Sequence, residues 1–96
     1  MPSAKLDIVS ASLWYEQRRE GLGDRFIDQL ELVFYVIRTQ NDLLVTPYAR
    51  FPNFDVRRLF VPRFPYRVFF VETDTRRDVF AVLKHGQDES NWRSRI

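Results

Sequence analysis

The residues of this sequence best equipped for chemistry are basic and lie in its second half. His85 is the only histidine, and imidazole is the side chain that most readily takes up or releases a proton near neutral pH. Arg58 and Arg67 each carry a planar guanidinium whose donors match the oxygens of a phosphate. If the fold brings these three residues together, they can hold a phosphate from two sides and move a proton beside it.

Plain structural roles are also open to these residues. His85 can form a hydrogen bond at a strand end or contact a partner, and Arg67 can form a salt bridge to Glu72 or to an Asp of the helical hairpin. Lys84 directly precedes His85, so on a strand the two point to opposite faces and at most one of them joins such a site. Five residues are candidates for contact with phosphate or an acidic partner: Arg57, Arg63, Lys84, Trp92 and Arg93.

The composition argues against metal and cofactor chemistry. The chain has no cysteine and one histidine, which excludes a thiolate site, a disulfide framework and a histidine-rich site. Glu16, Glu20 and Asp24 lie close together but lack the spacing of metal ligands, so we assign them to helix caps and the surface. Nine Phe, four Tyr and two Trp among 96 residues predict one domain, residues 1–96, that folds without a cofactor or metal.

Charge is unevenly distributed along the chain. Residues 1–56 contain six Lys and Arg against eight Asp and Glu, a net charge of −2, whereas residues 57–96 contain nine against five, a net charge of +4. The basic second half predicts contact with phosphate or an acidic partner, although a solvated charged face accounts for the same pattern. Neither a signal peptide nor a membrane-spanning apolar run is visible, so we expect a cytoplasmic protein that does not contact a membrane.

Up to residue 40 the apolar residues follow helical periodicity. We predict a first helix over about residues 4–19, with Ser3 as its N-cap and two apolar sets that merge into one wide face. Gly21-Leu22-Gly23 tolerates positive φ and ends this helix, and Asp24 caps a second helix over about residues 25–40. The first apolar set is Leu6, Val9 and Leu13, and the second is Ala4, Ile8, Ala11 and Tyr15.

After a proline-containing connector at residues 47–52 the pattern changes to that of strands. We predict three strands, over about residues 55–61, 66–73 and 79–85, in an antiparallel meander whose middle strand is buried on both sides. Residues 86–96 are expected to form a tail that docks through Trp92. The predicted fold class is therefore α+β, an N-terminal helical hairpin packed on a small antiparallel sheet.

Six short segments, in this order along the chain, resemble the running pattern of RelE/ParE toxins, the small bacterial proteins encoded beside a neutralising antitoxin. The resemblance covers nearly the whole chain and implies the RelE/ParE-like fold and a cognate antitoxin as partner. The segments are Trp14-Tyr15-Glu16, Gly21-Leu22-Gly23-Asp24-Arg25-Phe26, Arg57-Arg58, Arg63-Phe64-Pro65-Tyr66-Arg67-Val68, Ala81-Val82 with His85-Gly86, and Trp92-Arg93.

Two features depart from the family pattern. The family fold normally begins with a strand before the first helix, and here Met1 lies almost at the helix, so we expect that strand to be truncated or lost. Its absence would uncover one sheet edge and one flank of the hairpin, which predicts association as a two-fold homodimer. The family also often has a basic residue after the His-Gly pair, where this chain has Gln87, Asp88 and Glu89.

The resemblance implies one of two activities. ParE-like members act on DNA gyrase, whereas RelE-like members cleave mRNA on the ribosome. Cleavage needs groups that accept and donate a proton and cations around the phosphorus, and His85, Arg67 and Arg58 are the catalytic residues we expect if the protein is such an RNase. A lone histidine without a nearby Tyr or Lys pair is a poor catalytic set, and two long helices suit the hairpin of ParE-like members. We therefore expect a gyrase-inhibiting toxin; the alternatives are the mRNA endonuclease and a degenerate, non-toxic protein that still binds an antitoxin.

Overall fold

The computed structural model describes the backbone of residues 2–41, 47–86 and 89–96 and the side chains of residues 3–41, 47–86 and 92–96. Its first half is a hairpin of two helices, α1 (Pro2–Arg18) and α2 (Leu22–Thr39). Within the described ranges, the second half is a four-stranded antiparallel sheet in the order β1-β2-β3-β4, followed by the 3₁₀ helix η1 (Glu89–Arg95). The strands are β1 (Ala49–Arg50), β2 (Asp55–Phe60), β3 (Tyr66–Glu72) and β4 (Arg77–Lys84).

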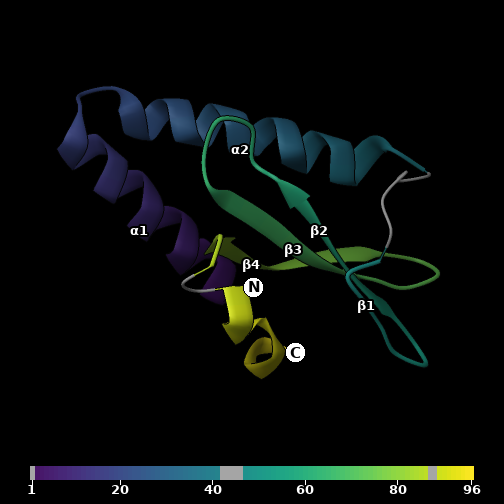
Figure 1. Cartoon of the computed structure of the whole chain (residues 1–96). Helices are drawn as coiled ribbons and strands as arrows, with labels where there is room; N and C mark the ends of the chain where they lie inside the picture. The colour runs from purple at the N-terminus through teal and green to yellow at the C-terminus, as the bar shows by residue number, and fades with distance from the viewer. Residues whose placement is uncertain (1, 42–46, 87–88) are drawn as a thin grey trace.

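The α+β class predicted from the sequence is confirmed, and three of the strands lie where they were expected. The short strand β1 was not predicted, because two residues in a loop carry no periodicity that a sequence pattern can reveal. Figure 1 shows α2 lying across one side of the sheet and η1 on the other side. The sheet is therefore the middle layer of the molecule.

The turn between α1 and α2 depends on two glycines with different roles. Gly21 has a φ of 83°, as expected for a residue that ends a helix in the left-handed conformation. Gly23 lies inside α2, where an added Cβ would meet the backbone oxygen of Ser12 at 2.6 Å, so the helices approach too closely for any larger residue. Glu16 accepts hydrogen bonds from the backbone N–H groups of Gly21 and Gly23, at 2.9 and 3.0 Å.

The predicted helix caps were wrong. Helix α1 begins at Pro2, so Ser3 lies inside its first turn and is not the N-cap. Helix α2 begins at Leu22 with Gly21 as its N-cap, and Asp24 lies within the first turn. The free N–H groups at the start of α2 are bound instead by the Glu16 carboxylate, which reaches them from the neighbouring helix.

Helix α1 does not have the single wide apolar face that was predicted. Ala4, Ala11 and Tyr15 are buried against the rest of the protein, whereas Leu6, Val9 and Leu13 are exposed. The reason is that residues two positions apart lie about 200° apart around a helix axis. Leu6 and Leu13 follow Ala4 and Ala11 by two positions, so the two apolar sets lie on opposite sides of α1.

Both faces of the sheet are buried, as predicted for its middle strand. Val68, Phe69 and Phe70 of β3 are fully inaccessible to solvent. Val68 and Phe70 pack in a cluster with α1 and α2, whereas Phe69 packs in a second cluster on the opposite face, together with Trp92 of η1. The burial of Trp92 confirms that the C-terminal segment docks through this side chain.

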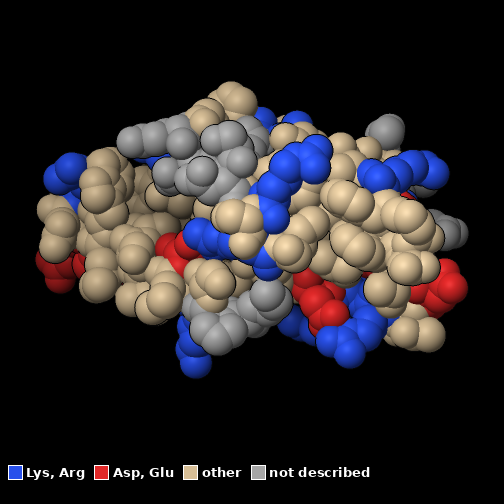
Figure 2. All heavy atoms as spheres, turned by 90° about the horizontal axis from the view of Figure 1, so that it is seen from below, with Lys and Arg blue, Asp and Glu red and all other residues tan. Residues whose placement is uncertain are grey.

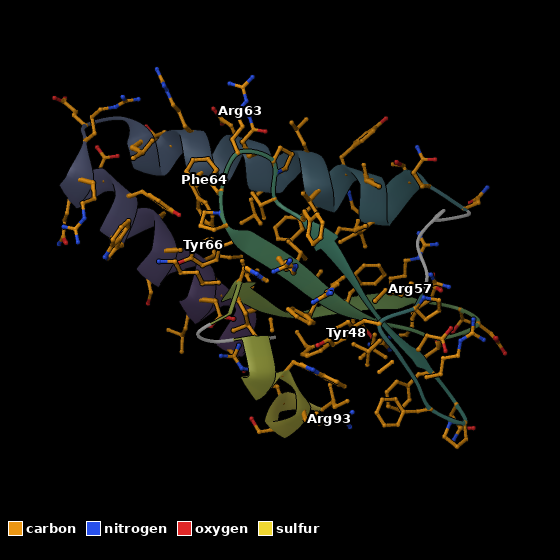
Figure 3. The ribbon with its side chains drawn as sticks, in the orientation of Figure 1. Tyr48, Arg57, Arg63, Phe64, Tyr66 and Arg93 are labelled. Carbon is orange, nitrogen blue, oxygen red and sulfur yellow. The ribbon has the colours of Figure 1, made fainter. Side chains whose placement is uncertain are left out.

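An aromatic cluster joins the helical hairpin to the turn between β2 and β3. The ring of Phe26 lies 5.4 Å from Tyr15 of α1, 5.2 Å from Phe64 and 5.2 Å from Tyr66, measured between ring centroids. Most of these contacts are edge-to-face, the arrangement that aromatic quadrupoles favour. Figure 3 shows Phe64 of the turn and Tyr66 of β3 on the side of the sheet where the two helices lie.

Asp7 of α1 binds both the edge of the sheet and the C-terminal helix. Its Oδ2 accepts the backbone N–H of Val82 in β4 at 2.9 Å, and its two oxygens accept hydrogen bonds from Arg95 at 2.5 and 3.1 Å. Strand β4 is the last strand of the sheet, so this contact occupies one of its outward N–H groups. The described edge is thus partly covered by α1 and η1. No helix among the described residues is long and apolar enough to span a membrane.

A network of ion pairs ties the sheet to the end of α2. Glu72 of β3 pairs with Arg57 at 2.7 Å and with Arg77 at 2.6 Å. Arg77 also donates to the backbone carbonyls of Ile37 and Gln40, at 2.9 and 2.5 Å, and so binds the negative end of the helix. Burial alone would raise the pKa of Glu72, but the hydrogen bonds from Arg77 and Arg57 outweigh it and hold the pKa below its ordinary value.

Candidate functional site

The pairing of the strands brings Arg58, Arg67 and His85 to one face of the sheet. Arg58 lies opposite Phe69 in the β2–β3 pair, and Arg67 lies opposite Leu83 in the β3–β4 pair. Directly opposed residues share a face, and Phe69 and Leu83 both belong to the cluster on the side away from the helices. His85 follows Leu83 by two positions, which places it on this side as well.

Side-chain contacts form two neighbouring sets on this face, and the charge of Arg58 acts on Arg67 between them. Arg67 Nη1 is hydrogen-bonded to His85 Nδ1, and the Arg67 guanidinium lies over the ring of Phe60 at 4.4 Å from its centroid. The Arg58 guanidinium lies over the ring of Tyr48 at 4.0 Å. We call Tyr48, Arg58, Phe60, Arg67 and His85 the arginine–histidine cluster.

The two arginines of the cluster influence each other electrostatically. The pKa of Arg67 is lowered by burial first and then by the positive charge of Arg58, whereas Tyr48 acts in the opposite direction. An arginine remains protonated despite such a shift, so the site carries two positive charges on partly buried groups. An anion bound between them would relieve the repulsion, which makes this face suited to phosphate. Figure 2 shows the molecule from below, the side away from α2, where Lys and Arg side chains are spread over the surface.

The contact with Arg67 determines which nitrogen of His85 carries the proton. A guanidinium has donors and no acceptor, so Nδ1 of His85 must offer its lone pair. The proton of the neutral ring then lies on Nε2. In this arrangement neither ring nitrogen has a lone pair available to take a proton from a substrate, so His85 is placed to donate a hydrogen bond rather than to act as a general base.

This arrangement predicts the tautomer of His85, which nitrogen NMR measures directly because the chain has one histidine. The neutral ring is expected to be protonated on Nε2, and Arg67→Met should allow the Nδ1-protonated form to appear. Lys84→Met is the matched control, since Lys84 adjoins His85 in the chain but lies on the other face, and it should leave the ratio of tautomers unchanged. A wild-type ring protonated on Nδ1 would show that Arg67 does not donate to it.

Two of the basic residues proposed for partner contact lie on the helix side of the sheet. Arg57 is opposite Phe70 and forms its ion pair with Glu72 there. Lys84 is opposite Tyr66, and its ammonium lies 5.4 Å from the centroid of the Trp14 ring of α1. Lys84 and His85 therefore point to opposite faces, as predicted from their adjacent positions on a strand.

The other three candidates for partner contact are dispersed. Arg63 is exposed in the turn between β2 and β3, with a φ of 69°. Trp92 is buried in the core, and Arg93 is exposed with its guanidinium 4.6 Å from the centroid of the Trp92 ring. Figure 3 shows Arg63 beside α2 and Arg93 on η1, at opposite sides of the molecule, so these residues do not form one site.

Sequence reasoning missed Tyr48 and Phe60. Phe60 lies two positions after Arg58 on a predicted strand, so alternation alone places both on one face, and this signal was available. Tyr48 lies just before β1, and no pattern in the sequence indicates that it packs under Arg58. The same ring is 5.8 Å from Phe69 and 5.5 Å from Trp92, so only the folded chain brings it to the cluster.

The described residues contain no group of three or more His, Cys, Asp and Glu that could hold a metal ion. Comparison with protein-family models, with curated proteins and with solved structures finds no match to this chain. The function of this chain is therefore inferred from its sequence motifs and from the geometry of the arginine–histidine cluster.

Proposed function

We propose that this protein is the toxin of a type II toxin–antitoxin system and that it acts in the ParE-like manner, on DNA gyrase. The observation that carries the proposal is where the resembling segments lie in the fold. Tyr15 comes from the first segment, Phe26 from the second, and Phe64 and Tyr66 from the fourth, and their rings form one cluster. Because residues from separate motifs meet in one core, a fold shared with the family accounts for these motifs better than chance agreement does.

Two features support gyrase over mRNA as the target. The helices contain 17 and 18 residues and form the long hairpin that the resemblance associates with ParE-like members. His85, whose Nδ1 is bound by Arg67, has no lone pair available for the 2′-OH proton in this arrangement. The arginine–histidine cluster is then a binding surface for a phosphate or an acidic side chain, and not a poised nuclease site.

The second candidate is a ribosome-dependent mRNA endonuclease, and a specific observation favours it. Arg58, Arg67 and His85, predicted as the catalytic set of an RNase, lie together, and Tyr48 adds a hydroxyl-bearing ring beside Arg58. Substrate phosphate could draw Arg67 away from His85 and free its Nδ1, since catalytic hydrogen bonds often form only in the complex. The partner proposed in either case is an acidic antitoxin that neutralises the basic second half of the chain.

Two assays on the purified protein discriminate between the targets. We expect inhibition of gyrase supercoiling and no cleavage of mRNA on ribosomes. His85→Ala should weaken the inhibition of gyrase by less than about tenfold, the effect of one lost hydrogen bond, whereas an endonuclease would lose on the order of a hundredfold or more in rate through loss of a general acid or base. Ribosome-dependent cleavage that disappears in His85→Ala and Arg67→Ala would reverse the assignment.

Toxicity itself is tested in living bacteria. Expression of the protein should arrest growth, and co-expression of the product of the adjacent gene should restore growth and copurify with it. A chain that binds this product but does not arrest growth would be the degenerate, non-toxic protein considered above. Failure of both effects would remove the basis for a toxin–antitoxin assignment.

A further inference from the structure

One side of α1 carries an apolar stripe that stays about half exposed in the described structure. Leu6 is 67% exposed, Val9 48% and Leu13 58%. Trp14 at the flank of the stripe is 44% exposed, with the guanidinium of Arg18 and the ammonium of Lys84 against its ring. The first three follow each other at spacings of three and four, so they lie in a line along the helix. They lie opposite the side of α1 that packs into the core through Ala4, Ala11 and Tyr15, as noted above.

This stripe is large for an unpartnered surface. Each of its four side chains exposes on the order of 100 Å² of apolar area, about half of what a large side chain can bury. Together they form a patch on the order of 400 Å², which lies in the range where the largest patch on a monomer is often functional. Beside it, a groove of about 500 Å³ between α1 and β4 is lined by Leu6 and Trp14 together with the charged side chains of Asp7, Lys84 and Arg95.

We propose that a second copy of this chain covers the stripe, so that the protein forms a two-fold dimer through α1. A standard interface buries about 800 Å² on each partner, of which somewhat more than half is apolar. The apolar area of the stripe is therefore close to the apolar area that each partner buries in a standard interface. Leu6, Val9 and Leu13 carry no charge and offer nothing for a charged partner to pair with, whereas an identical stripe is complementary to them. This inference does not depend on the target or on toxicity.

The charges beside the stripe select the antiparallel arrangement. Lys5 lies near one end and Glu16 near the other, both exposed and on the same flank, since eleven residues correspond to just over three full turns. The Glu16 carboxylate keeps its negative charge while it accepts hydrogen bonds from Gly21 and Gly23. With a two-fold axis beside Val9 and Ser10, Leu6 comes to the same end of the pair as the partner's Leu13. Lys5 likewise comes to the same end as the partner's Glu16, and the two-fold axis generates two such oppositely charged pairs. A parallel pair would bring like charges together.

Light scattering and sedimentation on the full chain test the dimer. We expect dimers at about 100 μM, and Leu13→Glu should weaken association at least thirtyfold, the effect of losing a central interface residue of about 2 kcal/mol. Leu32→Glu is the matched control because Leu32 is 56% exposed on α2, and it should leave association unchanged. Lys5→Glu should also weaken the dimer, since it replaces two attractive pairs by two repulsive ones.

Cross-linking tests the arrangement, and the absence of native cysteine makes single-cysteine variants clean reporters. Ser10→Cys lies near the proposed axis and should be joined to its own copy by a short bis-maleimide. Lys5→Cys should not, because antiparallel helices would hold the two copies about 13 Å apart along the axis. A monomer at this concentration, a dimer insensitive to Leu13→Glu, or cross-linking at Lys5→Cys alone would each overturn the proposal. A stripe covered only when another protein is added would overturn it as well.

Discussion

Replacing Phe26 by alanine is expected to lower the free energy of unfolding by roughly 3–5 kcal/mol, the usual cost of deleting a buried aromatic ring. Phe26 is fully inaccessible to solvent and contacts rings from α1 and from the β2–β3 turn. Its removal would open a cavity where the hairpin joins the sheet, and neighbours fixed by three other elements cannot collapse into it. Because a domain of this size is stabilised by only about 5–15 kcal/mol, the loss is a large part of the total.

Urea unfolding followed by circular dichroism measures this change as a shift in midpoint at unchanged slope. Leu32→Ala on the exposed side of the same helix is the control and should change stability by less than about 0.5 kcal/mol. If Phe26→Ala does not fold at all, Phe26→Leu keeps most of the volume and should cost less than about 1.5 kcal/mol. If Phe26→Ala lowers the free energy of unfolding by less than about 1 kcal/mol, as a surface substitution would, the Phe26 ring is not packed among three elements.

Glu72→Gln is expected to destabilise the protein by about 2–3 kcal/mol at pH 7, somewhat less than breaking a fully buried ion pair. The substitution leaves Arg57 and Arg77, whose side chains are only 15% and 17% exposed, without the carboxylate between them. The pKa of Glu72 is held below its ordinary value of 4.5 in the folded protein. Its contribution to stability is therefore fully present above that value and is lost as the pH falls through the lower, folded pKa.

The test is the free energy of unfolding of the wild type and of Glu72→Gln, measured from pH 7 to about 3. Only the wild type loses the contribution of Glu72 in acid. The difference between the two should be constant down to about pH 5 and shrink below the ordinary glutamate pKa. Asp78→Asn is the matched control, since Asp78 pairs with Arg76 where both side chains are well exposed, and it should have no measurable effect. A difference that persists unchanged at low pH would mean that the glutamine itself disturbs packing.

The sequence was sufficient for the elements of this fold because each has a strong local signal. Phe26, Leu30, Val33 and Ile37 repeat at helical spacing and are all buried on one side of α2. The run from Val68 to Phe70 is apolar at every position and forms the central strand, buried from both sides. Trp92, isolated in a polar tail, was correctly predicted to dock, since a ring of that size rarely remains in water without a partner.

Positions at the ends of helices and in loops were predicted less well, and the reason is physical. The start of α2 is bound by Glu16 from the preceding helix, a contact that depends on how closely the helices pack at Gly23. Such tertiary contacts replace the local cap that Asp24 was expected to provide. Tyr48 joins Arg58 only because the chain at β1 folds back to pair with β2 at the edge of the sheet.

By itself, the sequence determined the order of helices and strands, the two-sided burial of β3 and the shared face of Arg58, Arg67 and His85, since all three follow from the periods of helix and strand. Only the tertiary structure decided that Arg67 binds His85 and that Arg57 is drawn to Glu72 on the other face. It also decided that one apolar side of α1 is buried and the opposite side exposed. The repeat of a helix or strand specifies the direction in which a side chain points from its own element. Which neighbour that side chain meets depends on packing between segments far apart in the chain.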